Sequence, residues 1–171
     1  MLYLYTGDGK GKTTAALGAA LRATGYGWNV AIIQFMKGTW HTGEIDAVKA
    51  IPNIDLIQAG KGFYKILDDK FTDEEHQAAA QEAIELIQEK INSKKYQLII
   101  LDEVNVAADL KLLEEKAILD LLNNADASLH FIFTGRNAPQ SFIDHADLVT
   151  EMTNIKHPFD NGIQALKGLD F

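Results

Sequence analysis

A glycine- and lysine-rich segment at residues 6–14, with the sequence TGDGKGKTT, places the strongest constraint on the fold. It lies between a short apolar run at residues 2–5 and a helical pattern at about residues 13–24. Glycines allow positive φ angles, so successive backbone N–H groups can turn toward one anion without a Cβ in the way. The following helix adds its unpaired N–H groups and the positive end of its dipole. The segment therefore predicts a phosphate-binding loop, or P-loop, that opens a helix.

The predicted loop carries the side chains that a nucleoside triphosphate site requires. Lys12 supplies a mobile positive charge, and the hydroxyl of Thr13 is placed to ligate Mg²⁺. The usual spacing puts a glycine where this chain has Thr6. A glycine-rich turn with incidental lysines is the alternative, and the strand–loop–helix setting argues against it. The candidate ATP-binding residues of the loop are Gly7, Asp8, Gly9, Lys10, Gly11, Lys12, Thr13 and Thr14.

A second motif, Asp102 followed by Glu103, comes directly after an apolar run at residues 98–101. Parallel sheets bind ligands at the carboxyl ends of their strands, so we expect both carboxylates to lie beside the P-loop. Asp102 is then expected near the metal ion and Glu103 at the mouth of the site. The alternative is a strand that ends in two solvated acids. The candidate metal-binding residues are Thr13, Asp102 and Glu103.

An arginine follows a further apolar strand in the same way. The strand at residues 129–133 leads into a Thr-Gly-Arg sequence that ends at Arg136, whose guanidinium can neutralise charge on a leaving phosphate group. An ordinary surface arginine in a strand-to-helix turn is the alternative. We predict Lys12, Glu103 and Arg136 as the catalytic residues. Three residues at or beyond the end of the second strand are further candidates, each in competition with a structural turn: Gln34, Lys37 and Glu44.

Apolar runs alternate with helical patterns along the chain. This alternation predicts one domain, residues 1–171, with an α/β fold: a mainly parallel sheet with helices on both faces, in the three-layer P-loop NTPase-like (RecA-like) arrangement. Thr72 and Glu75 form a capping box at the start of the longest helix, so Glu75 is interpreted as a cap and not as a metal ligand. Further helices are expected at residues 112–122 and after Pro139. Strands are expected at residues 2–5, 30–35, 55–58, 98–101, 129–133 and 148–151.

The composition excludes several kinds of site. The chain has no cysteine, which rules out disulfides, thiolate zinc sites and cysteine nucleophiles. The formal net charge of −8 argues against a nucleic-acid partner, since phosphate backbones attract basic surfaces. No apolar run approaches the roughly 20 residues that a membrane helix needs, and no signal peptide precedes the first strand. We therefore expect a cytoplasmic protein with no membrane partner.

Eight segments, taken in order, carry a resemblance to one family. The most specific of them are the QF-x-KG, TGR, ADL-x-TEM and KG-x-DF sequences. Together the segments cover nearly the whole chain, which resembles the P-loop corrinoid adenosyltransferases of the CobA type. The segments are residues 6–16, 25–27, 34–40, 101–103, 134–136, 146–152, 156–159 and 167–171.

The resemblance implies an activity. Family members transfer the 5′-deoxyadenosyl group of ATP to the Co(I) ion of a reduced corrinoid and release inorganic triphosphate. Co(I) is itself a strong nucleophile, so no serine, cysteine or His–Asp arrangement is required. Residues 9–13 would hold the triphosphate with Mg²⁺, and ATP would lie reversed relative to most P-loop proteins, which presents its 5′ carbon to cobalt. Arg22, Glu103 and Arg136 match the family's nucleotide and metal contacts. The resemblance also implies a homodimer and a reduced flavin or flavodoxin-type electron donor.

The corrinoid side of the site departs from the family pattern. Members carry a Gly-Phe-x-Trp sequence whose aromatic residues help to remove the lower axial cobalt ligand. Residues 62–65 of this chain read Gly-Phe-Tyr-Lys, so Phe63 matches and Lys65 replaces the tryptophan. The candidate corrinoid-binding residues are Phe63 and Tyr64. Many members also have an extra N-terminal segment over the site, whereas the first strand here begins at Leu2, so the cover is expected from elsewhere, such as a partner subunit.

Two other functions are compatible with the motifs. One is a phosphotransferase or ATPase with the ordinary nucleotide orientation, which would use Asp102 and Glu103 around Mg²⁺ and produce ADP. The other is a corrinoid or nucleotide sensor that binds without turnover. Product identity separates the first from an adenosyltransferase, and tight binding of both ligands without adenosylation would identify the second.

Overall fold

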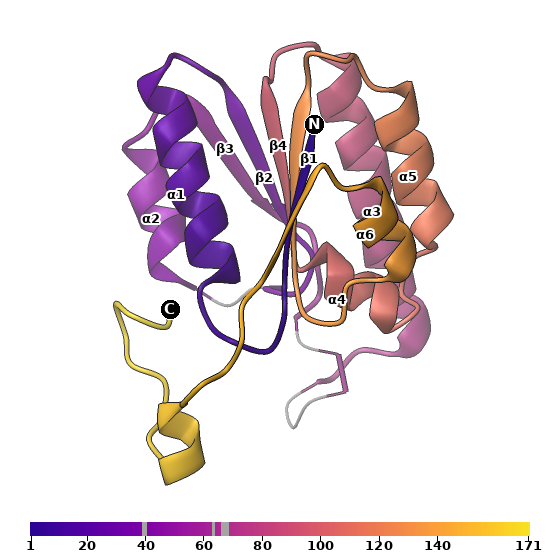
Figure 1. Cartoon of the computed structure of the whole chain (residues 1–171). Helices are drawn as coiled ribbons and strands as arrows, with labels where there is room; N and C mark the ends of the chain where they lie inside the picture. Colours follow the sequence, from indigo (N-terminus) through magenta and orange to yellow (C-terminus); the bar gives the residue numbers. More distant parts are fainter. Residues whose placement is uncertain (39–40, 63, 66–68) are drawn as a thin grey trace.

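The computed structural model describes residues 1–171 with the exception of 39–40, 63 and 66–68. A six-stranded sheet with the order β3-β2-β4-β5-β1-β6 runs through its middle, and every pairing between neighbouring strands is parallel (Figure 1). The predicted α/β class and parallel sheet are therefore confirmed. The strands are β1 (Leu2–Thr6), β2 (Val30–Gln34), β3 (Ile54–Gln58), β4 (Leu98–Asp102), β5 (His130–Thr134) and β6 (Leu148–Glu151).

Helices cover both faces of the sheet, which confirms the predicted three layers (Figure 1). Successive residues of a strand point to opposite layers. Ile32 of β2 lies in one apolar cluster with Ala20 of α1, whereas the adjacent Ile33 lies in the other cluster with Ile87 of α3. Small alanines on α1 let that helix pack closely on the sheet. The helices are α1 (Lys12–Gly25), α2 (Gly43–Lys49), α3 (Asp73–Asn92), α4 (Val104–Asp109), α5 (Glu115–Asn124), α6 (Gln140–His145) and the 3₁₀ helix η1 (Pro158–Asn161).

The register of the sheet brings four strand ends together. Gln34 at the end of β2 pairs with Asp102 at the end of β4, and Tyr5 of β1 pairs with Thr134 at the end of β5. Because all strands run the same way, the P-loop that follows β1 emerges at the same edge as these three residues. The topology thus assembles the site from segments that lie far apart in the sequence.

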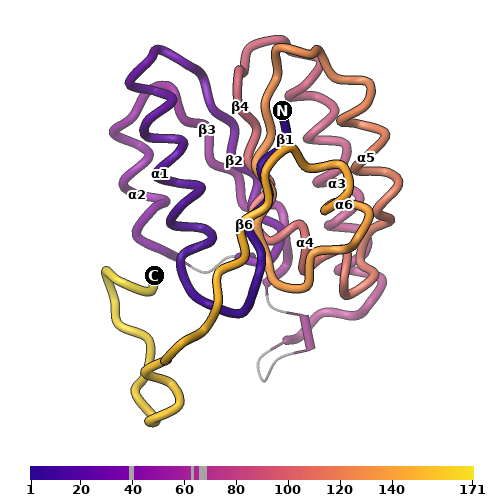
Figure 2. The backbone as a smooth tube through the Cα atoms, in the orientation of Figure 1, coloured from indigo at the N-terminus to yellow at the C-terminus, as the bar shows by residue number. Residues whose placement is uncertain are grey.

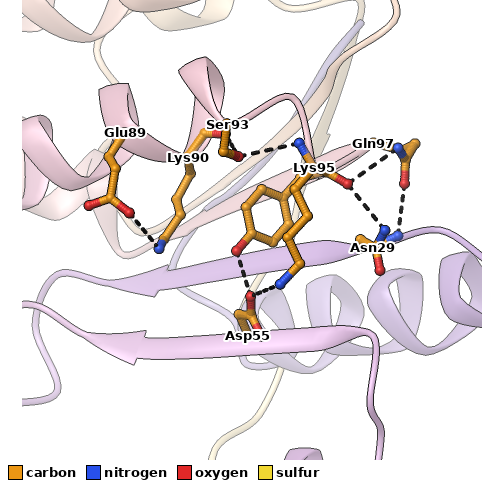
Figure 3. A network of polar contacts seen from close by, with 8 residues as sticks. Asn29, Asp55, Glu89, Lys90, Ser93, Lys95 and Gln97 are labelled. Atoms are coloured by element: carbon orange, nitrogen blue, oxygen red, sulfur yellow. Dashed lines mark hydrogen bonds and ion pairs between the residues drawn. The ribbon is translucent and has the colours of Figure 1, made fainter.

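A polar network fixes the opposite end of the sheet (Figure 3). Asp55 of β3 accepts hydrogen bonds from the amino group of Lys95 at 2.8 Å and the hydroxyl of Tyr96 at 2.5 Å. The amide oxygen of Gln97 accepts from the backbone N–H of Asn29 at 2.8 Å. These contacts tie the turn after α3 to the starts of β2 and β3, and none of them reaches the P-loop edge.

Several helix boundaries differ from the prediction. The capping box of α3 is confirmed, with Glu75 N–H donating to Thr72 Oγ1 at 3.3 Å and the Glu75 carboxylate accepting from Thr72 N–H at 2.8 Å. The predicted start of α5 at Leu112 is wrong, because Leu112 fills the core from a turn in which Lys111 has a positive φ of 58°. Helices α2 and α4 were not predicted, since six or seven residues are too few to show a helical repeat.

The chain after β6 leaves the sheet and turns back (Figure 2). In that view residues 152–171, drawn in yellow, descend past the P-loop, and the C-terminus lies near the start of α1. Within the described ranges, no helix has both the length and the apolar character needed to cross a membrane.

Candidate functional site

The P-loop is held from outside by the chain that follows β6. The backbone N–H of Met152 donates to Thr6 O at 2.8 Å, and the N–H of Gly9 donates to Met152 O at 2.6 Å. A Cβ at Gly7 would lie 2.5 Å from Met152 O, and a Cβ at Gly9 would lie 2.7 Å from that oxygen and from Thr153 O. Gly7 also has a φ of 92°. Glycine is therefore required here by a close backbone contact as well as by the turn itself.

Lys12 is the first residue of α1 and is folded into its own loop. Its side chain is buried, and its amino group donates to Gly7 O at 2.6 Å and to Gly9 O at 2.7 Å. Burial lowers the pKa of Lys12, and the nearby Glu103 carboxylate opposes that shift. The loop carbonyls thus hold a cation at the N-terminus of α1, in the position where a bound phosphate group would meet it.

Asp102 is 1% exposed and joins three strands at the end of β4 through its hydrogen bonds. Its Oδ1 accepts from the hydroxyls of Thr13 at 2.8 Å and Thr134 at 2.7 Å, while its Oδ2 accepts from Gln34 Nε2 at 3.1 Å. Because Thr13 donates its proton to Asp102, the lone pairs of its oxygen are left for a cation. Both oxygens of Asp102 accept hydrogen bonds, so the group is placed to orient the hydroxyl of Thr13.

Glu103 lies at the N-terminus of α4 in a left-handed conformation, with φ 62°. Its N–H donates to Thr134 Oγ1 at 2.9 Å, which fixes this uncommon backbone geometry. Burial raises the pKa of Glu103, and the neighbouring Asp102 adds to the shift, while Lys12 opposes it. The carboxylate of Glu103 and the hydroxyl of Thr13 are hard oxygen ligands of the kind that Mg²⁺ prefers. Among the described residues, no three His, Cys, Asp or Glu side chains form a cage for another kind of metal.

These residues surround a cavity of about 420 Å³. It brings together most of the predicted site, since residues 8–14, Glu103 and Arg136 all line it. Asp102 and Gly7 do not line the cavity themselves. Asp102 accepts a hydrogen bond from the hydroxyl of Thr13, and Gly7 O accepts one from the amino group of Lys12, and both of these donors line it. The cavity is also lined by residues whose role was left open or was not predicted: Leu17, Lys37, Gly43, Glu44, Gly168, Leu169, Asp170 and Phe171.

Lys37 and Glu44 extend the hydrogen-bonded chain from Asp102. Gln34 Nε2 lies 3.4 Å from Glu44 Oε1, and the same oxygen lies 3.6 Å from Lys37 Nζ. The pKa of Glu44 is lowered by its hydrogen bonds and by Lys37, against the effect of burial, so the group is an anion. Lys37 and Glu44, which follow β2, are thus part of the cavity wall and not only part of a structural turn.

Arg22 is not brought to this cavity. It lies ten residues beyond Lys12 on α1, which is about 15 Å along a helix. It lines a separate pocket of about 520 Å³ whose walls are largely aromatic, including Tyr3, Tyr5 and Trp28. The position of Arg22 within one chain therefore does not support the expected contact with the nucleotide.

The candidate corrinoid residues are only partly described. Phe63 lies outside the described residues, as does Trp40. Tyr64 packs against the apolar core, with its ring 5.1 Å from that of His76, and it does not line the P-loop cavity. His76 is buried and contacts Asp69 at 3.0 Å; this contact and two backbone N–H groups lower the pKa of Asp69 to about 2. The pair joins Asp69 to α3.

The sequence was also compared with known proteins. The profile of the family described as ATP:corrinoid adenosyltransferase BtuR/CobO/CobP matches residues 1–171. A corrinoid adenosyltransferase from Sinorhizobium sp is 35% identical over 174 residues, which cover 100% of this chain and 80% of the relative. The corrinoid adenosyltransferase of Escherichia coli (strain K12) and corrinoid adenosyltransferase CobA of Salmonella typhimurium (strain LT2) are each 34% identical over 173 residues. The match covers 100% of this chain and 85% of each relative. The similarity extends over the whole chain, and the chain belongs to the ATP:corrinoid adenosyltransferase family.

Proposed function

We propose that this chain transfers the 5′-deoxyadenosyl group of ATP to the Co(I) ion of a reduced corrinoid, and that the P-loop cavity holds the triphosphate that leaves. The observation that carries the proposal is the arrangement of charge around one cavity. Lys10, Lys12, Lys37 and Arg136 all line it, and the N-terminus of α1 opens into it. Four carboxylates, Asp8, Glu44, Glu103 and Asp170, also line the cavity, so these cations favour a triphosphate together with a bound Mg²⁺ ion.

The reaction needs little chemistry from the protein. A bond forms between cobalt and C5′, the bond between C5′ and its oxygen breaks, and the electron pair departs with the triphosphate. Among the described residues that line the cavity there is no serine, cysteine or histidine. Co(I) itself serves as the nucleophile in this family. The chain therefore acts by positioning the two substrates and by stabilising charge on the leaving group.

Five residues at the site have a role in that stabilisation. The N–H groups at the start of α1 and the amino group of Lys12 bind the phosphate oxygens. Thr13 and Glu103 hold Mg²⁺, with Asp102 fixing the orientation of Thr13. The metal ion, when bound, neutralises charge on the triphosphate as the bond to C5′ breaks. Arg136 is exposed at the rim, where its guanidinium reaches the departing oxygens.

ATP is expected to lie reversed in the loop, with its 5′ carbon toward the corrinoid. Phe63 and Tyr64 are the candidate contacts for the corrinoid, as the family resemblance implies. A reduced flavin or a flavodoxin-type protein is the expected electron donor. Location in the cytoplasm is an expectation from composition alone.

The expected homodimer has a candidate interface in the aromatic pocket around Arg22. This pocket lies beside the edge strand β6, whose residues are all exposed, including Leu148 at 39% and Val149 at 42%. A second copy of the chain would cover this apolar surface and bring Arg22 close to another subunit. Sedimentation of the wild type and of Leu148→Asp tests the interface, because Leu148 is in register with Tyr3 of the pocket and a dimer through this face should dissociate in the variant.

Product analysis tests the proposed activity. The chain is incubated with ATP, Mg²⁺ and chemically reduced cobalamin, and the expected products are a light-sensitive alkylcobalamin and inorganic triphosphate in equal amounts. Formation of ADP or orthophosphate without adenosylated product would instead identify a phosphotransferase or ATPase. Tight binding of ATP and corrinoid with no product under strong reduction would identify a sensor.

A further inference from the structure

A carboxylate from the end of the chain occupies part of the nucleotide cavity. Asp170 forms an ion pair with Lys10 of the P-loop, and its other oxygen accepts from the N–H of Leu166 at 2.6 Å. The turn that presents it is closed by hydrogen bonds from Gly168 N–H to Phe171 O at 2.8 Å and from Asp170 N–H to Leu166 O at 2.8 Å. Residues 168–171 thereby form one wall of the cavity. Figures 1 and 2 show the C-terminus close to the start of α1.

Little else holds this segment in place. Among the described residues, the pair between Lys10 and Asp170 is the one hydrogen bond or ion pair that joins residues 156–171 to the rest of the chain. The apolar side chains along it stay in solvent, as Leu169 at 78% and Phe159 at 75% exposure illustrate. Because both partners of the ion pair are partly exposed, the contact is weak and reversible.

We propose that Asp170 is a tethered counter-ion of the nucleotide site. It neutralises Lys10 when the site holds no triphosphate, gives Lys10 up to the triphosphate of ATP, and returns to Lys10 as the triphosphate product leaves. The inference rests on the proposed function, in which the P-loop holds the whole triphosphate.

The physical need for such a group follows from the reaction. A site that stabilises a leaving triphosphate also binds the free triphosphate product tightly, so product release limits turnover unless something replaces the product. A carboxylate on a short tether is present at an effective concentration of about millimolar, whatever the solution contains. Asp170 and a triphosphate cannot share Lys10, because their negative charges repel. Asp170 therefore weakens the binding of triphosphate and of ATP through the same contact with Lys10. The benefit to turnover is the faster release of the triphosphate product.

Binding of inorganic tripolyphosphate with Mg²⁺, measured by calorimetry, tests the proposal without any corrinoid. Asp170→Asn should bind tripolyphosphate about two- to fivefold more tightly than the wild type, as expected for losing one partly exposed competing ion pair. Asp160→Asn is the matched control, because it removes the same charge from the same segment at an exposed residue whose side chain makes no hydrogen bond or ion pair with the P-loop. It should leave the affinity unchanged. Equal or weaker binding by Asp170→Asn, relative to the control, overturns the proposal.

A second measurement needs no variant. Lys167 precedes the turn, so trypsin can remove residues 168–171 in one cut. Tripolyphosphate should increase the rate of this cut in the wild type, because it releases the segment, and protection by tripolyphosphate would overturn the proposal. In turnover, Asp170→Asn should show a burst of one adenosylated corrinoid per site followed by a slower steady rate. If no adenosylcorrinoid forms at all while the shift in tripolyphosphate affinity is present, the proposed function fails and the counter-ion role stands.

Discussion

Asp102→Asn is the sharpest test of how the metal side of the site is built. In the wild type both carboxylate oxygens accept hydrogen bonds, one from Thr13 and Thr134 and the other from the amide of Gln34. An asparagine keeps one acceptor, and its NH₂ group then meets the NH₂ group of Gln34. Gln34 can turn its amide over, because its Oε1 has no hydrogen-bond partner among the described residues. The turned amide accepts from the new asparagine.

The structure sets the size of the effect. Hydrogen bonds to a charged group contribute about 1.5–3 kcal/mol and neutral ones about 0.5–1.5 kcal/mol, so weakening three of them predicts a loss of about 1–3 kcal/mol in the free energy of unfolding, since removing a buried charge offsets part of the loss. The turned Gln34 also stops donating to Glu44. Asp102→Ala is the matched comparison, because it leaves all three donors unpaired and should cost about 3–6 kcal/mol.

Urea unfolding measures the stability of both variants, and Mg²⁺ titration of adenosyl transfer measures the site. Asp102→Asn should fold, yet it should need about 10–100-fold more Mg²⁺ for half-maximal activity, as is typical when a group that orients a metal ligand is lost. Wild-type Mg²⁺ dependence in a folded Asp102→Asn variant would show that Thr13 does not depend on Asp102. Equal stability of the asparagine and alanine variants would refute the amide rotation of Gln34.

Three further predictions concern the loop and its neighbours. Lys12→Ala should remove the main cation under the triphosphate and abolish turnover in a product assay, and activity near that of the wild type would place the triphosphate elsewhere. Gly9→Ala should abolish ATP binding in calorimetry, because its Cβ would lie 2.7 Å from two carbonyl oxygens. Glu103 has a raised pKa, so in metal-free protein the free energy of unfolding should fall as the pH rises above 4.5, the group's ordinary value. Urea unfolding of Glu103→Gln should lack this contribution, and an unchanged pH profile would contradict the buried environment.

Much of the site was predictable because it depends on local rules. The P-loop, Asp102 and Arg136 each follow an apolar strand, and parallel strands bring their carboxyl ends to one edge. The same rule points to Gln34, although the sequence does not reveal that its amide lies between two carboxylates. Family resemblance supplied the chemistry, which no spacing of residues in this chain indicates by itself.

The parts that were not predicted depend on long-range packing. Helix α4 is six residues long, and its start is fixed by a threonine from another strand. The return of residues 166–171 to the P-loop rests on one ion pair between residues 160 positions apart, for which the local sequence gives no signal. Arg22 matched a family contact by position, yet its place three turns along α1 follows only from helix geometry.

The two backbone hydrogen bonds that join Met152 to Thr6 and Gly9 have a consequence for synthesis of the chain. Residues 6–14 are made well before the backbone groups of Met152 that hold them. A nascent or truncated chain that ends before residue 152 carries the nucleotide motif without these contacts. Such a fragment should bind ATP more weakly, so β6 and Met152 make nucleotide binding depend on synthesis of the chain past residue 152.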